Sequence, residues 1–213
     1  MARSTNKSAS SARSEIFPSS DYNGVNLNNQ DFRNKNLENA NFTKANLENA
    51  NFASTNLRGI DFLKANLMSS NFQKANLERA DFSGADIRFS NLDNSNLRFS
   101  TLEGAKFIKA SLKNVDFTEA KISDARFKGA NLENSKFKYT ELNDADFSGA
   151  NLRNVVFDKC ALFNTDFENA DLTGAKIYLS STDGAGVERA NFKGAIGLTK
   201  EQKDLLKANG AII

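Results

Sequence analysis

The stretch that decides the fold runs from residue 40 to residue 52 and reads ANFTKANLENANF. A small residue, an Asn and a large apolar residue recur in it every five positions, and the period continues in both directions. Between residues 27 and 177, the 31 positions whose numbers end in 2 or 7 hold 15 Leu, 13 Phe, 3 Ile and nothing else. The 28 positions two residues earlier, from 40 to 175, are nearly all Ala, Ser or Thr. The repeating unit is therefore small, Asn or Asp, Leu or Phe, polar, polar.

A period of five fits neither an α-helix nor a continuous strand. The two apolar positions of a unit lie two residues apart and point to one side, so the chain must turn once per unit to keep the next pair inside. Four turns close a coil of 20 residues, and stacked coils hydrogen-bond to their neighbours about 4.8 Å away. The pattern predicts an all-β solenoid with Leu and Phe filling a central shaft.

These units resemble the pentapeptide-repeat family, with the consensus A-(N/D)-L-X-X. Stretches such as ANLEN, ANFAS and ADFSG recur for some 35 units between Tyr22 and Phe192. The resemblance implies a right-handed quadrilateral parallel β-helix, and the unit count predicts about nine 20-residue coils. Phe occupies alternate units up to Phe82 and changes to the other pair of opposite faces from Phe107 onward.

Three segments are expected along the chain. Residues 1–20 form a disordered, basic, Ser-rich tail in which Ile16, Phe17 and Pro18 could cover the first coil. Residues 21–196 form the β-helix. Residues 197–213 form a capping helix and tail, with a capping box of Thr199 and Gln202, a helix over 200–209 and a stop at Gly210. The pattern falters at Tyr178–Arg189 and resumes in register at Phe192, which predicts a loose coil with no inserted residues.

Composition excludes several classes of function. The chain has 213 residues, 28 basic and 26 acidic side chains, no His and one Cys. Without His there is no imidazole base, Ser-His or Cys-His pair or His metal ligand, so neither an enzyme nor a cofactor or metal site is expected. The single thiol, Cys160, falls at an inward small position and is expected to be a buried packing residue.

No apolar run is long enough for a transmembrane helix, and the N-terminus lacks the apolar stretch of a secretory signal. A cytoplasmic protein without membrane contact is expected. The Ser-rich, basic N-terminus leaves an organelle-targeted form open.

Outward positions that are not polar are the candidate interaction surface. Spacing by 20 residues groups Phe99, Tyr139, Tyr178 and Leu179 with Val156 on one face. Phe89 and Ile108 fall with Met68 on the opposite face, which also carries a basic patch of Arg88, Lys106, Lys109, Arg126 and Lys128.

The sequence favours a non-enzymatic rigid scaffold that presents flat faces to an unknown partner protein. Two alternatives remain. The family resemblance implies that the rod could imitate DNA and bind DNA gyrase or topoisomerase, although residues 21–213 carry 25 basic and 25 acidic side chains. The basic patch could instead bind an anionic polymer, although near-zero net charge makes nucleic acid an unexpected partner. A homodimer through the C-terminal segment or a flat face also stays open.

Overall fold

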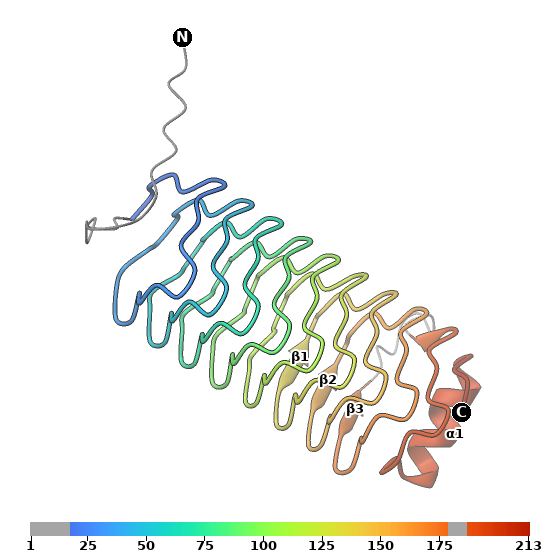
Figure 1. Cartoon of the computed structure of the whole chain (residues 1–213). Coiled ribbons are helices and arrows are strands. Elements are labelled where there is room, and N and C mark those ends of the chain that lie inside the picture. The colour runs from blue at the N-terminus through green and yellow to red at the C-terminus, as the bar shows by residue number, and fades with distance from the viewer. Residues whose placement is uncertain (1–17, 179–186) are drawn as a thin grey trace.

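The computed structural model describes residues 18–178 and 187–213 as a straight rod of stacked coils, with the N-terminal coil at one end and a helix at the other (Figure 1). Residues twenty apart pair in parallel, as in Asn46 with Asn66 and Asn66 with Asp86. The longest strands are β1 (Lys136–Lys138), β2 (Val156–Asp158) and β3 (Lys176–Tyr178), in a parallel sheet of order β1-β2-β3. One coil is thus four units, as the sequence predicts.

The corners of the coil are tight turns with one residue in the left-handed region. In the unit of Phe42, the Ala45 N–H donates to the Phe42 carbonyl over 2.9 Å, and Lys44 between them has φ 56°. This is the arrangement of a type II turn, which needs a positive φ at its third residue. The same position holds Asn or Gly at many other corners, because these residues adopt that conformation at little cost.

Where a unit carries Asn before its large apolar residue, the amide side chain hydrogen-bonds within the turn and can link neighbouring coils. The Asn41 side-chain oxygen accepts from the Thr43 N–H over 2.9 Å. Between coils, Asn66 Nδ2 donates to Asn46 Oδ1 at 3.0 Å, and Asn46 Nδ2 donates to Asn26 Oδ1 at 3.1 Å. The amide side chains therefore form ladders along the rod and close the polar edges of the turns.

Columns of aromatic rings fill the shaft. Phe52 stacks on Phe32 at 4.6 Å between ring centroids, and Phe127 stacks on Phe107 at 4.9 Å. The columns change faces at mid-rod, as the spacing predicts. A single tilted contact of 6.4 Å between Phe82 and Phe107 joins the two sets of rings across a coil whose shaft positions hold only Leu and Ile.

The rod ends in α1 (Lys200–Ala208), which lies against the last coil (Figure 1). The predicted capping box forms, since Gln202 N donates to Thr199 Oγ1 and Thr199 N donates to Gln202 Oε1. The helix ends one residue earlier than predicted, because Asn209 leaves the helical conformation and its N–H bonds back to the last turn. Gln202 Nε2 also donates to the Ala175 carbonyl at 3.0 Å.

One prediction about the last coil is wrong. Asp166 pairs with Asn191 and Asp171 with Ile196, a separation of 25 residues in place of 20. One extra unit therefore lies in this turn, and Val187 occupies the buried position beyond Leu162. A whole extra unit leaves the five-residue register unchanged, which is why Phe192 returns on schedule. The predicted loose conformation falls mostly on residues 179–186, outside the described residues, as do Ile16 and Phe17.

Candidate interaction faces

The structure groups the predicted surface residues as the spacing indicates. The Phe89 face consists of Met68, Arg88, Phe89, Lys106, Ile108, Lys109, Arg126 and Lys128. Its coils are joined by pairing of Asp86 with Lys106 and of Lys106 with Arg126. The Phe89 ring is 52% exposed, whereas Met68 and Ile108 are half-buried beside it. The Phe89 face is therefore a shallow apolar strip next to a basic one.

The basic side chains of the Phe89 face differ in their partners. Arg88 donates two hydrogen bonds of 2.8 Å to the Asp86 carboxylate, from Nε to Oδ1 and from Nη2 to Oδ2. Burial of Asp86 opposes its ionisation, but these hydrogen bonds and the Arg88 charge together lower its pKa. Among the described residues, no acidic group lies within ion-pair distance of the remaining four cations, Lys106, Lys109, Arg126 and Lys128.

The opposite side of the square carries the Tyr139 face, which consists of Phe99, Tyr139, Val156 and Tyr178. Tyr139 and Tyr178 are 48% and 53% exposed. Cations flank two of these rings. Arg79 and Arg98 lie 5.7 and 5.3 Å from the Phe99 centroid, and Lys138 and Lys159 lie 5.1 and 5.5 Å from that of Tyr139. The rings are thus held as aromatic and cationic clusters.

Three aromatic rings, of which Phe89 and Tyr139 are exposed and Phe99 is half-buried, occupy the left-handed turn position. The φ angles are 63° at Phe89, 60° at Phe99 and 53° at Tyr139. Elsewhere among the described corners this position holds Asn, Gly, Ser, Lys, Asp, Arg or Glu. A bulky side chain at positive φ costs on the order of 1–2 kcal/mol. The aromatic residues at these corners are therefore not explained by the needs of the turn.

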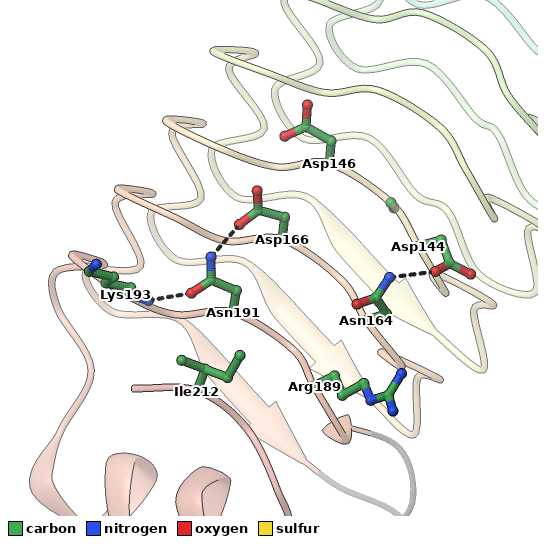
Figure 2. Close-up of a pocket in the computed structure, with 9 residues that line it drawn as sticks. Asp144, Asp146, Asn164, Asp166, Arg189, Asn191, Lys193 and Ile212 are labelled. Atoms are coloured by element: carbon green, nitrogen blue, oxygen red, sulfur yellow. Dashed lines mark hydrogen bonds between the residues drawn. The ribbon is translucent and has the colours of Figure 1, made fainter.

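Two further features were not predicted from the sequence. Phe163 lies beside Arg189, whose Cζ is 5.8 Å from the ring centroid. Near it is an acidic hollow of about 570 Å³, lined mainly by Asp144, Asp146, Asp166, Arg189 and Lys193 (Figure 2). These Asp residues resemble ordinary turn formers in sequence, and the 20-residue spacing of Asp146 and Asp166 was the signal that could have revealed the hollow. Leu179 lies outside the described residues.

The one thiol and the carboxylates are the remaining candidates for chemistry. Cys160 is buried, as predicted, and burial is the main cause that raises the pKa of its thiol to about 11. In the described part of the chain, no three Cys, Asp or Glu side chains form a group that could hold a metal ion. The described helix, α1, is neither long nor apolar enough to cross a membrane.

The chain belongs to the pentapeptide-repeat family. The family described as pentapeptide repeats (8 copies) matches residues 23–59, 45–84, 60–98 and 80–118, and the related pentapeptide repeat region matches residues 110–187. No curated protein matches the chain in sequence at a significant level.

Two solved structures of one protein show the same fold. QnrB1, a plasmid-mediated fluoroquinolone resistance protein, matches in one trypsin-treated form with a TM-score of 0.75 and 20% identity, over 93% of this chain and 98% of QnrB1. A second trypsin-treated form gives 0.74 and 22%, over 92% and 95%. HetL from the cyanobacterium Nostoc sp. strain PCC 7120 is 22% identical over 81% of this chain and 86% of its own, with a TM-score of 0.36. The likeness to QnrB1 identifies the rod as a right-handed β-helix.

Proposed function

We propose that this protein is a non-enzymatic scaffold that binds a partner protein through the flat faces of its rod. The observation that carries this proposal is the placement of Phe89, Phe99 and Tyr139 at corner positions with positive φ, where their rings stand partly exposed. Strained conformations persist where something other than stability maintains them, and partly exposed aromatic rings beside cations are typical of protein-binding surfaces.

Binding of an anionic polymer is less well supported. The basic patch spans only two coils beyond Arg88, and the next coils on the same face carry Asp146 and Asp166. A polymer that followed the rod would meet these carboxylates within about 10 Å, given coils spaced about 4.8 Å apart. Imitation of duplex DNA is also disfavoured. It would need a continuous negative surface along the rod, and cations interrupt the acidic residues on this face.

A crosslinking capture from lysate of the source organism tests the proposal. The bait is the wild-type chain or the double variant Phe89→Asp, Phe99→Asp. Asp accepts positive φ, so the turns should survive while the rings are lost. We expect a specific protein to be captured by the wild type and depleted at least tenfold by the variant.

The matched control is Asn94→Asp, Asn134→Asp, which adds the same charge at the same turn position on a corner that belongs to neither face. It should capture the partner as the wild type does. Equal capture by all three baits, or loss with both variants, would refute the assignment of the rings. Capture of gyrase or topoisomerase by all three would instead favour the DNA-imitating alternative.

We also propose that residues 197–213 cap the rod. Leu206 is fully buried, the Ile212 N–H donates to the Ala190 carbonyl at 2.8 Å, and the Ile212 carbonyl accepts from Phe192 N at 2.7 Å. An uncovered coil would offer these groups to another chain. Leu206→Asp should therefore lower the melting temperature and promote aggregation, whereas Leu205→Asp, at an exposed neighbour, should do neither.

A further inference from the structure

One column of side chains along the Phe89 face changes sign along the rod. In consecutive coils it reads Asp86, Lys106, Arg126, Asp146 and Asp166, each paired in register with the next. Asp86 is neutralised by Arg88. The column therefore presents two positive coils followed directly by two negative ones.

None of these four charges forms a close ion pair among the described residues, although the Lys106 charge also contributes to lowering the pKa of Asp86. Asp146 and Asp166 accept local bonds only through Oδ1, from the Ser148 and Glu168 N–H groups and, at Asp166, from Asn191 Nδ2. Among the described residues neither Oδ2 has a hydrogen-bond partner, and neither Lys106 nor Arg126 has an ion-pair partner. Figure 2 shows the side chains of Asp146 and Asp166 side by side on successive coils.

The opposite face behaves differently. There Arg58 pairs with Glu38 at 3.0 Å and with Glu78 at 3.7 Å, and Lys138 pairs with Asp158 at 3.5 Å. Several charges on the Tyr139 face thus form ion pairs inside one molecule, whereas Lys106, Arg126, Asp146 and Asp166 on the Phe89 face do not among the described residues.

We propose that the Phe89 face binds a second copy of this chain in antiparallel orientation. A two-fold axis across the face, between the coils of Arg126 and Asp146, reverses the rod and keeps each column opposite itself. Arg126 then meets Asp146 of the other copy, and Lys106 meets Asp166. Each contact occurs twice, as two-fold symmetry requires. Electrostatic complementarity of this kind fixes orientation and register.

Neighbouring columns fit the same arrangement. Glu168 then lies against Ile108 and next to Lys109, and Phe89 lies against Gly194, where no side chain opposes the ring. The hollow of about 570 Å³ around Asp146 and Asp166 lies opposite Lys106 and can receive its side chain.

Like charges meet only toward the corners of this arrangement. There Asp124 lies against Asp144, and both are exposed to water. Arg88, which Asp86 already neutralises, lies against Lys193.

Sedimentation equilibrium of the full chain with charge-reversed variants tests this inference. We expect a dimer at about 0.05 M salt that dissociates at about 0.5 M as the charges are screened. Lys106→Glu, Arg126→Glu makes the column acidic, and Asp146→Lys, Asp166→Lys makes it basic. Each variant alone should weaken self-association at least tenfold, and an equimolar mixture of the two should form a heterodimer.

The fourfold variant that combines these changes keeps the wild-type net charge and should dimerise again. Circular dichroism checks that every variant folds. A wild type that is monomeric at low salt would overturn the inference, even if it binds polylysine or heparin. So would dimers that all variants retain, which would place the contact elsewhere, such as the C-terminal end. The control variant Lys136→Glu lies on the Tyr139 face and should leave dimerisation unchanged. Sedimentation uses the purified chain alone, so its result does not depend on the capture of another protein.

Discussion

Ser95 and Ser135 occupy equivalent buried positions two coils apart, but only one of their hydroxyl groups has hydrogen-bond partners. Ser135 Oγ donates to the Leu112 carbonyl at 2.6 Å and accepts from the Val115 N–H at 3.1 Å. Ser95 Oγ is equally buried and has no partner among the described residues. A buried, unsatisfied hydroxyl costs about 1–3 kcal/mol. Ser95→Ala should therefore raise the melting temperature by about 2–4 °C. Ser135→Ala should lower it, and a decrease for both variants would contradict this account.

Cys160 should make stability fall at alkaline pH. The folded pKa of about 11 lies above the ordinary value of 9.0, so above pH 9 the unfolded chain loses a proton that the folded chain keeps. This favours unfolding, and the loss of stability should grow to about 2–3 kcal/mol by pH 11. Urea unfolding of the wild type and of Cys160→Ala at pH 8, 9, 10 and 11 isolates this effect from other titrating groups. Parallel pH profiles for the two proteins would disprove it.

At the scale of the five-residue unit, the left-handed corner residue sets the direction of the chain. Asn134 has φ 61°, and its neighbour Glu133 does not have a positive φ. A β-branched side chain at positive φ is strained, so Asn134→Val should lower the free energy of unfolding by about 1–2 kcal/mol. Glu133→Val, one residue earlier and half-buried in the same turn, should change it by less than about 0.5 kcal/mol. Equal losses from urea denaturation would show that the conformation of the corner does not matter.

At the scale of the whole molecule, the shaft is continuous, so a defect in it affects many coils. Phe127 stacks between Phe107 at 4.9 Å and Phe147 at 4.8 Å and is fully buried. Phe127→Lys would place an unpaired charge there and should abolish the β-type circular dichroism signal of the rod. Leu97→Lys should do the same, whereas the exposed Lys128→Ala should not. A retained signal and melting temperature in the shaft variants would contradict the coil architecture.

The sequence predicts this architecture well because period, burial and turn chemistry all repeat in phase. The 5-residue and 20-residue periods predict the Phe columns and the grouping of Phe89 with Lys106. The spacing of Thr199 and Gln202 predicts the capping box. The extra unit in the last turn could not be predicted, since a whole unit leaves the period intact. The acidic hollow was missed because Asp146 and Asp166 also serve the turns, so their charge carried no separate signal.

The 25-residue turn has a consequence for how such a chain can evolve. Buried positions repeat every five residues, whereas positions on the same outer face repeat every twenty residues. Gain or loss of one unit through unequal recombination therefore keeps every Leu and Phe inside and rotates all later surface residues by a quarter turn. Asn191 has moved in this way onto the face of Asp166 and away from that of Asp171. Insertion or deletion of one unit can thus change which surface residues share a face of the rod, while the packed core and the fold are kept.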